Sequence, residues 1–364
     1  MNKKQKKIAI LLPSLKFGGA ERVSLNLATE MKLQGISIDI LVMSKEGEFL
    51  AEAERNFAVH DLKCNKTYKL PYLMLLYMIR NQPNVLISNF WKLNISACLT
   101  RVLFPFFKLI LWEHSPPSKT LFSPTWIYAL SASLLYLFAS KIVAVSDGVR
   151  ADIQRYTIGL SGKLITIYNP IIPPDDLLLQ NSKISSRNTF QIISLGRLEL
   201  EKNQALLIQA FALLPVEINA TLLMVGDGSQ RKKLEQMCID LNVQEKVKFF
   251  GFITDPYQIL IKADLLVLPS NFEGFGNVII EAFYCGLPVV STDCPYGPRE
   301  LLMNGKYGSL VPVSDKVAMA KAIQYEHENR RSSELQKFAA QRFLPSVIVK
   351  QFLDVMNCNK SGKI

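Results

Sequence analysis

Several patterns that would assign a function directly are missing from this sequence of 364 residues. Its six cysteines form no C-x-x-C pair, and neither they nor its three histidines have a metal-ligand spacing. There is no D-x-D triplet, no G-x-S-x-G nucleophile motif and no Walker A loop. We therefore expect reduced, mostly buried thiols in a cytoplasmic protein that uses no metal and no cofactor.

Long apolar runs are also missing. The segment Leu121–Ser140 is apolar but interrupted by Pro124 and several Ser and Thr residues, and a transmembrane helix needs about 20 apolar residues. At the start of the chain, a lysine-rich tail precedes a short apolar run that Pro13 interrupts, which does not fit a signal peptide. The sequence leaves peripheral attachment to the inner membrane face open.

The positive charge is concentrated in the first half of the chain. Residues 1–170 hold 21 Lys and Arg against 11 Asp and Glu, whereas residues 171–364 hold 21 against 20. This asymmetry predicts an anionic partner for the first half, either a membrane surface, a phosphate-bearing substrate or nucleic acid, with a solubility bias as the alternative. A basic and aromatic region in this half comprises Lys63, Lys66, Lys69, Arg80, Lys92 and residues 101–112. Such a region suits binding to anionic lipid headgroups. The alternative is an ordinary helical core whose lysines snorkel to the surface.

The length predicts two domains, and apolar runs that alternate between strand and helix periods predict parallel sheets covered on both faces. A proline-rich segment, Asn169–Asp176, marks the boundary between residues 1–170 and 171–345. A final helix is expected at about 346–357. Expected strands in the first half are 7–14, 37–43, 57–62, 84–88, 108–113, 141–146 and 163–168. Those in the second are 190–195, 221–225, 246–250, 265–269, 288–291 and 309–313.

The stretch Asn271–Glu281 is the strongest candidate site. It follows an apolar strand, and its glycines Gly274 and Gly276 allow a tight turn before a helix. The N–H groups at that helix start form a site for an anion or polar ligand, and the carboxylates of Glu273 and Glu281 are suited to sugar and ribose hydroxyls. The alternative is an acid that favours the helix dipole plus a solvated glutamate.

Basic residues follow another expected strand. Arg197 comes directly after Gly196, and Lys202 lies five residues later, so that a guanidinium fork and a point charge are available for a diphosphate. The alternative to a diphosphate site is a surface charge cluster, in which Glu199 and Glu201, which lie between the two cations, neutralise both of them. The pair Gly18-Gly19 opens the first helix without completing a dinucleotide fingerprint. The main chain of Gly251, Phe252 and Ile253 is placed to hold a planar base.

Two further residues are candidates for the acceptor side. His114 ends an expected strand before a proline-rich loop, where a functional role is favoured over the structural role that lone histidines usually have. Arg299 lies in the glycine- and proline-rich segment 293–300, which fixes its direction.

Together these motifs resemble the retaining GT-B glycosyltransferases of family four over nearly the whole chain. They are Glu273-x7-Glu281, Gly196-Arg197 with Lys202, Gly226-Asp227-Gly228 and Gly18-Gly19-Ala20-Glu21-Arg22. The resemblance implies two Rossmann-like domains facing each other across a cleft, an acceptor-binding one first and a nucleotide-sugar-binding one second. It also implies that the final helix, at about 346–357, packs back on the first domain. Segment 293–300 looks like that of bacterial members that build lipid-linked glycans, O-antigens or capsules.

The resemblance also implies residue roles. Arg197 and Lys202 would bind the donor diphosphate, Glu273 the sugar and Glu281 the ribose. Gly18 and Gly19 would approach the phosphates, and His114 would lie near the reaction centre. The main chain of Phe275, Gly276, Asn277 and Val278 would surround sugar and phosphate.

The implied reaction moves a hexose or N-acetylhexosamine from a nucleotide sugar, expected to be UDP-linked, to a polyprenyl-diphosphate-linked glycan. No obvious protein nucleophile is present, so a same-face displacement is favoured, in which the leaving phosphate oxygen takes the acceptor proton. The alternatives are a soluble enzyme with a small acceptor or a nucleotide-sugar epimerase. A nucleic-acid-binding module rests on charge alone, and we expect no nucleic-acid partner.

Overall fold

The computed structural model describes residues 6–120, 125–174 and 189–357. Outside these residues lie the start of the basic tail, part of the apolar segment 121–140 and most of the linker after Pro174. Cys358 also lies outside them. The chain divides into two compact units. The first contains the residues up to Ile172 together with those from Phe343 onward, and the second runs from Pro173 to Arg342.

The first unit is built on a parallel sheet that has seven strands in the described part of the chain, in the order β3-β2-β1-β4-β5-β6-β7. These strands are β1 (Lys7–Leu12), β2 (Ser37–Val42), β3 (Ala58–Asp61), β4 (Val85–Asn89), β5 (Lys108–Glu113), β6 (Lys141–Ala144) and β7 (Leu164–Thr166). β1, β2, β4 and β5 are almost continuously buried, because helices cover both faces of the sheet.

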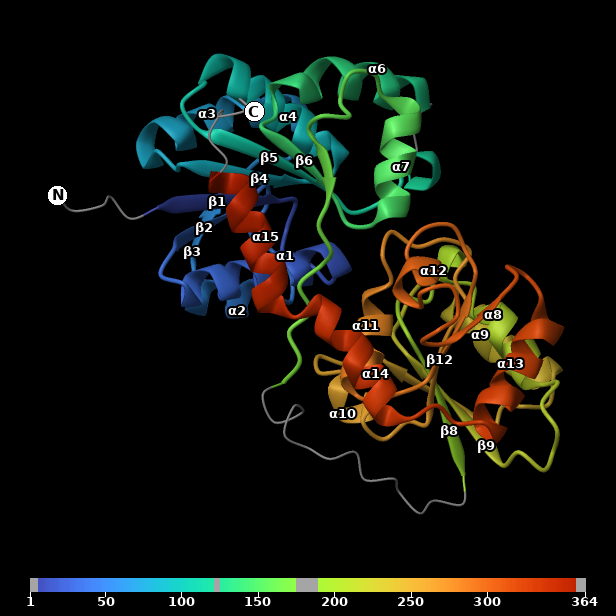
Figure 1. Ribbon diagram of the computed structural model, residues 1–364. Coiled ribbons are helices and arrows are strands. Elements are labelled where there is room, and N and C mark those ends of the chain that lie inside the picture. The colour runs from blue at the N-terminus through green and yellow to red at the C-terminus, as the bar shows by residue number, and fades with distance from the viewer. Residues whose placement is uncertain (1–5, 121–124, 175–188, 358–364) are drawn as a thin grey trace. The chain divides into compact units, whose positions relative to one another are not determined.

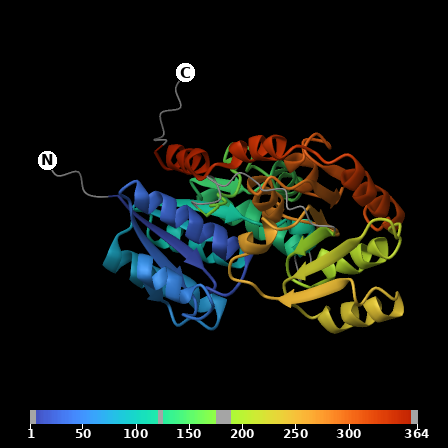
Figure 2. The ribbon, with the colours of Figure 1, turned by 90° about the horizontal axis from the view of Figure 1, so that it is seen from below.

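Right-handed crossovers divide the helices between those two faces. α1, α2 and α15 lie on one face, and α3, α4 and α6 cover the other (Figures 1 and 2). Helices of this unit are α1 (Gly19–Leu33), α2 (Leu50–Asn56), α3 (Leu70–Asn81), α4 (Trp91–Leu103), α5 (Pro117–Thr120), α6 (Thr125–Leu135), α7 (Asp147–Tyr156) and α15 (Pro345–Asn357), with the 3-10 turns η1 (Thr67–Lys69) and η2 (Tyr136–Phe138). α15 packs beside α1, and its Phe352 ring meets Trp112 of β5 with 4.9 Å between centroids.

The second unit repeats this design with six parallel strands among the described residues, in the order β10-β9-β8-β11-β12-β13. Its strands are β8 (Phe190–Leu195), β9 (Ala220–Val225), β10 (Val247–Gly251), β11 (Leu265–Leu268), β12 (Val289–Thr292) and β13 (Ser309–Val311). Its helices are α8 (Gln204–Phe211), α9 (Arg231–Asp240), α10 (Tyr257–Leu260), α11 (Asn277–Tyr284), α12 (Pro298–Leu301), α13 (Lys316–Glu328) and α14 (Ser333–Ala340), with the 3-10 turn η4 (Leu200–Lys202). One core lies between the sheet and α8, α9 and α13.

The predicted alternation of strands and helices is confirmed, and every strand end agrees with its expected position within two residues. Sequence reasoning missed α14, an eight-residue helix that packs against α11. A signal was present, because Ser332 caps this helix by accepting from the Leu335 N–H and Glu334 lies in its first turn. Its apolar pattern is too short to predict a helix by periodicity.

The strand orders create one switch point in each sheet. In the first unit β1 and β4 are neighbours, with β2 and β3 beyond β1 on one side and β5, β6 and β7 beyond β4 on the other. In the second unit β8 and β11 are neighbours, with β9 and β10 on one side and β12 and β13 on the other. Ligands of open parallel sheets bind beyond the carboxyl ends of strands at such points. Functional residues are therefore expected beyond the carboxyl ends of the strands at these two switch points.

The contact of α15 with the first sheet predicts a large packing contribution. Phe352→Ala should destabilise the first unit by about 3–5 kcal/mol, because both Phe352 and Trp112 are fully buried and the lost ring leaves a cavity. Urea unfolding measures this loss. Val347→Ala, at an exposed position of the same helix, is the control and should cost well under half as much; equal effects would contradict the packing role.

Candidate functional site

Two loops meet at the switch point of the second unit. The loop after β8 carries Arg197 and Lys202, and the loop after β11 carries Glu273. The Asn271 N–H donates to the Glu201 carbonyl at 2.8 Å, and Asn203 Nδ2 donates to Asn271 Oδ1 at 3.0 Å. Main-chain and side-chain hydrogen bonds thus join the two loops.

Lys202 and Glu273 form the central ion pair of this site. Lys202 Nζ lies 2.6 Å from Glu273 Oε1, which also accepts from Ser270 Oγ at 2.7 Å. Glu273 is buried, and its N–H donates to the Pro295 carbonyl at 3.3 Å. A buried carboxylate with a cation and a hydroxyl donor is held in one orientation, and removing the lysine would leave an uncompensated buried charge.

Arg197 is the exposed cation of the same edge. Its side chain is 66% exposed, and its Nη2 lies 2.8 Å from Glu201 Oε1. Glu199, the other acid expected to neutralise it, instead accepts from the N–H and hydroxyl of Ser229. Exposed pairs of this kind contribute about 0–1 kcal/mol, so a stronger anion can displace Glu201 at little cost.

The helix start predicted after Gly276 is confirmed. α11 begins at Asn277, and Gly276 precedes it with φ 95°, a conformation that favours glycine. Gly297 fixes the same loop, because a Cβ there would lie 2.0 Å from the Phe275 carbonyl oxygen. The N–H groups from Phe275 to Val278 lie at this helix terminus, and Glu281 lies one turn further on, half-buried. Burial, followed by the charge of Glu281, raises the pKa of Tyr257 on α10.

Three glycines line the carboxyl edge of adjacent strands β8, β9 and β10. The Gly226 N–H donates to the Gly251 carbonyl at 2.8 Å, and a Cβ on Gly226 would lie 2.0 Å from the Gly196 carbonyl oxygen. This close approach explains the glycine at position 226. Phe252 and Ile253 directly follow Gly251, the last residue of β10, which is an edge strand of this sheet.

The first unit holds three further candidates near its own switch point. Gly18 and Gly19 open α1 after β1, and His114 follows β5. His114 Nε2 lies 2.7 Å from Oδ1 of Asn89, the last residue of β4. Burial lowers the pKa of His114 to about 3, so its ring is neutral at physiological pH. Sequence reasoning missed Asn89, although a polar residue that ends an apolar strand was a usable signal.

A buried carboxyl group lies next to His114 in the chain. Glu113 Oε1 accepts a hydrogen bond from the Tyr136 hydroxyl and another, of 2.9 Å, from Asn94 Nδ2. Burial raises the pKa of Glu113 to about 7, although these two hydrogen bonds act in the opposite direction. The group is thus a neutral acid over much of the pH range below neutrality.

Arg299 is held by its own segment. Its Nε donates to Asp293 Oδ1 at 2.9 Å and its Nη2 to Asp293 Oδ2, and α12 carries it at the exposed surface. The described residues contain no group of three His, Cys, Asp or Glu side chains that could hold a metal ion.

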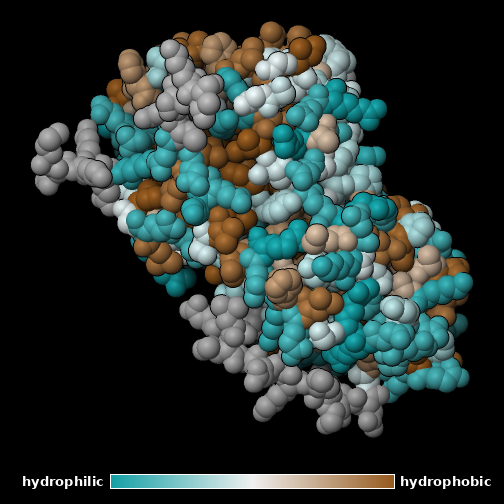
Figure 3. Space-filling model, in the orientation of Figure 1, coloured by the Kyte–Doolittle hydropathy of each residue, from teal (hydrophilic) through white to brown (hydrophobic). Residues whose placement is uncertain are grey.

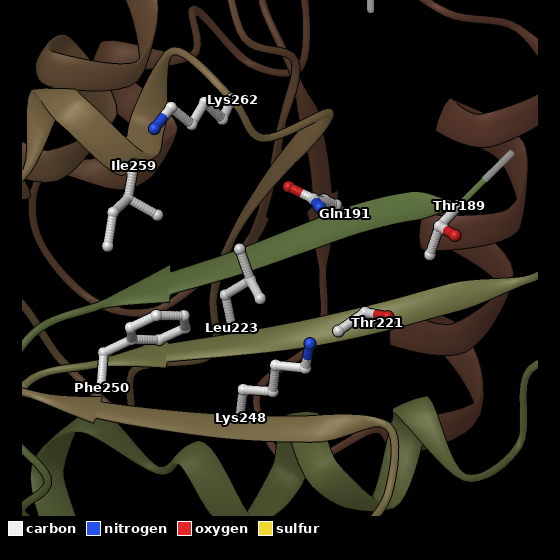
Figure 4. Close-up of a pocket in the computed structure, with 8 residues that line it drawn as sticks. All are labelled: Thr189, Gln191, Thr221, Leu223, Lys248, Phe250, Ile259 and Lys262. Carbon is white, nitrogen blue, oxygen red and sulfur yellow. The ribbon is translucent and has the colours of Figure 1, made fainter. Parts of the chain in front are cut away.

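A surface groove of about 360 Å³ lies elsewhere in the second unit (Figure 4). It crosses one face of β8, β9 and β10, where Gln191, Leu223 and Phe250 point into it, and α10 and the residue pair after it supply Ile259 and Lys262. None of the predicted site residues lines it.

Comparison with known proteins assigns the chain to a family. The family described as "Glycosyltransferase Family 4" matches residues 17–173, and "Glycosyl transferases group 1" matches residues 179–342. A Campylobacter jejuni protein, "N-acetylgalactosamine-N,N'-diacetylbacillosaminyl-diphospho-undecaprenol 4-alpha-N-acetylgalactosaminyltransferase", is 31% identical over 335 residues, which span 87% of this chain and 89% of the relative. The chain is a family 4 glycosyltransferase.

A second C. jejuni relative, "GalNAc-alpha-(1->4)-GalNAc-alpha-(1->3)-diNAcBac-PP-undecaprenol alpha-1,4-N-acetyl-D-galactosaminyltransferase", is 27% identical over 92% of this glycosyltransferase and 93% of its own length. Among solved structures, "Crystal structure of Anabaena Alr3699/HepE in complex with UDP" is similar with a TM-score of 0.82 and 24% identity, covering 97% of this chain and 99% of that one. The likeness confirms the predicted GT-B fold of this glycosyltransferase, with two Rossmann-like units.

The raised pKa of Glu113 predicts how the stability of this glycosyltransferase depends on pH. The protonated form is favoured by folding, so its stabilising contribution is complete below about pH 4.5 and is lost as the pH rises to about 7. Glu113→Gln removes this titration. Its free energy of unfolding relative to the wild type should therefore rise by about 3 kcal/mol across that range. Urea unfolding at a series of pH values measures the difference, and parallel curves would contradict it.

Proposed function

We propose that this family 4 glycosyltransferase transfers a hexose or N-acetylhexosamine from a UDP-linked donor to a polyprenyl-diphosphate-linked glycan. The arrangement of Arg197, Lys202 and Glu273 at the switch point of the second sheet carries the proposal. Two cations beside a helix N-terminus suit a diphosphate, and a buried, oriented carboxylate suits a sugar hydroxyl. The acceptor class is that in the names of the two C. jejuni relatives.

The proposed mechanism is electrostatic. Arg197, Lys202 and the N–H groups at the start of α11 stabilise the charge that develops on the leaving diphosphate. Glu273 holds the sugar, Glu281 holds the ribose, and the leaving phosphate oxygen takes the proton of the attacking hydroxyl on the same face. Anomeric configuration is therefore retained and no metal is needed. Activity that persists in EDTA and an α-linked product from an α-linked donor are the expected results.

Substitution of Arg197 tests the diphosphate site. Arg197→Ala should weaken UDP binding at least about tenfold, because a charge-assisted contact is lost. Glu201→Gln is the matched control, since it removes the same ion pair but keeps the guanidinium, and it should not weaken binding. Calorimetric titration with UDP measures both. Equal loss in the two variants, or none in Arg197→Ala, would contradict the assignment.

Substitution of Glu273 tests the sugar site. Glu273→Gln keeps the shape of the side chain but removes its charge, and turnover should fall about 100-fold or more while UDP binding stays within a few-fold. A panel of nucleotide sugars, screened by the thermal stabilisation they give, identifies the donor for the assay. Near-normal turnover in this variant would refute the role of Glu273.

We also propose that the first unit binds an anionic membrane surface. α3 packs on α4 and α4 on α6, and these helices, with the residues that follow α4 and α6, expose a set of apolar side chains that we call the apolar face. This face comprises Tyr72, Ile79, Leu99, Val102, Leu103, Phe106, Trp126, Leu130, Leu134, Leu137 and Phe138. Figure 3 shows hydrophobic atoms gathered along the top of the first unit, where Figure 1 draws α3, α4 and α6.

The charges around the apolar face favour anionic lipid as its partner. Between Asp61 and Asp147 the sequence has nine Lys and Arg residues and a single acid, Glu113, which is buried under α4. Lysines beside exposed aromatic side chains attract anionic headgroups while the aromatic rings enter the interface. In the described ranges, none of the helices has the length and hydropathy that a membrane span requires. The proposal places the enzyme peripherally on the inner, cytoplasmic membrane face, where a lipid-linked acceptor is presented.

Flotation with liposomes tests the membrane proposal. The wild type should float with vesicles that contain phosphatidylglycerol and stay behind with pure phosphatidylcholine. Leu103→Glu with Phe106→Glu should abolish flotation, because both side chains lie in the apolar face at 64% and 80% exposure. Ile158→Glu with Val216→Glu is the control at 84% and 82% exposure outside the face and should still float. Full recovery of the wild type in the soluble fraction would favour a small soluble acceptor instead.

A further inference from the structure

Asn89 is a buried polar residue at the switch point of the first unit. It is the last residue of β4, next to the carboxyl end of β1, and its side chain is fully buried. Buried amides are retained where every polar atom has a partner. The next residue, Phe90, has φ 66° and ψ 142°, a region that is almost confined to glycine, and such strain accumulates at functional sites.

The hydrogen bonds of Asn89 fix which way its amide points. Nδ2 donates to the Leu11 carbonyl at 2.9 Å, so Oδ1 is the atom that faces His114 Nε2 at 2.7 Å and Ser24 Oγ at 3.4 Å. An amide oxygen is only an acceptor. His114 Nε2 must therefore carry a proton.

The state of the other ring nitrogen follows. Burial keeps His114 neutral, since its pKa is lowered to about 3, and a neutral imidazole carries one proton only. With that proton on Nε2, Nδ1 has a free lone pair. Among the described residues Nδ1 has no hydrogen-bond partner. The ring is held between Phe90 and Trp112, with centroids at 5.6 and 4.6 Å.

We propose that Asn89 is a positioning residue that holds His114 in the neutral tautomer with the proton on Nε2, so that Nδ1 accepts a hydrogen bond from a substrate hydroxyl. His114 then neither donates a proton nor contributes positive charge at this edge. The identity of the ligand as a sugar hydroxyl rests on the proposed function. The tautomer does not, because it follows from the contacts of Asn89 together with the lowered pKa of His114.

Nitrogen-15 spectra of the full-length chain test the tautomer directly. Only three histidines are present, and His60→Gln and His327→Gln assign the third set of ring signals to His114. We expect a protonated Nε2, a bare Nδ1 and no titration between about pH 5 and pH 8, the range in which an unperturbed histidine titrates. A proton on Nδ1, or titration near pH 6.5, would overturn the proposal, and this measurement needs no substitution of Asn89.

Asn89→Asp tests whether Asn89 sets this state. The carboxylate keeps an acceptor for Nε2 but should raise the pKa of His114 by about 1–3 units, so that the ring begins to titrate at acid pH. Transferase activity relative to wild type should then fall several-fold as the pH is lowered towards about 5. Asn26→Asp is the matched control, because it loses the same kind of Nδ2–carbonyl bond, to Pro170, without a histidine beside it. Unchanged His114 signals in Asn89→Asp would overturn the role of Asn89.

Sugar probes test the contact at Nδ1. The labelled wild type is titrated in separate arms with UDP-N-acetylgalactosamine, with UDP alone and with free N-acetylgalactosamine. A shift of the Nδ1 resonance with the nucleotide sugar but not with UDP identifies a donor hydroxyl, and a shift with the free sugar identifies an acceptor hydroxyl. If UDP-N-acetylgalactosamine is turned over but neither probe moves Nδ1, the contact is refuted while the proposed function stands. If the tautomer is as expected and no nucleotide sugar binds, the proposed function fails instead.

Discussion

The ion pair between Lys202 and Glu273 joins two loops that are 71 residues apart in the chain. A lysine ammonium and a carboxylate are costly to bury separately, so the pair, with the Ser270 hydroxyl, is stable only when both loops take the observed path. The hydrogen bonds from Asn271 and Asn203 act in the same direction. The position of Arg197 and of the N-terminus of α11 depends on this junction, and so does the chemistry proposed for the second unit.

In the first unit, neutral groups rather than an ion pair join the elements at the switch point. At its switch point the amide of Asn89 bonds at once to β1, to α1 and to His114. A buried amide has no flexibility once all of its polar atoms are bonded, so the imidazole beside it is fixed in direction and in protonation. Both units therefore place polar side chains on the ends of parallel strands and hold each one with residues from a neighbouring strand or loop.

The helices on one face of the first sheet, α3, α4 and α6, differ from the rest of the unit in their exposed side chains. α3, α4 and α6 bury one side against the sheet, as helices of a parallel α/β unit must, but they also expose apolar side chains where charged ones are usual. The helices of this layer carry no acidic side chain. Glu113, on β5 beneath them, is buried and accepts hydrogen bonds from Tyr136 and Asn94. A lipid partner is proposed for this surface because exposed apolar side chains beside basic residues are typical of surfaces that bind anionic lipid.

The sequence by itself determined the strands, the two-unit alternation and the positions of Gly276, Arg197 and Glu273 at strand and helix ends, because these depend on short-range periodicity and on glycine at required turns. It placed His114 at the end of β5 for the same reason. Only the tertiary structure decided that Lys202 pairs with Glu273, that Glu201 rather than Glu199 pairs with Arg197, and that Asn89 faces His114. These pairings depend on which strands become neighbours, and strand order is set by crossovers and packing over the whole unit rather than by any local pattern.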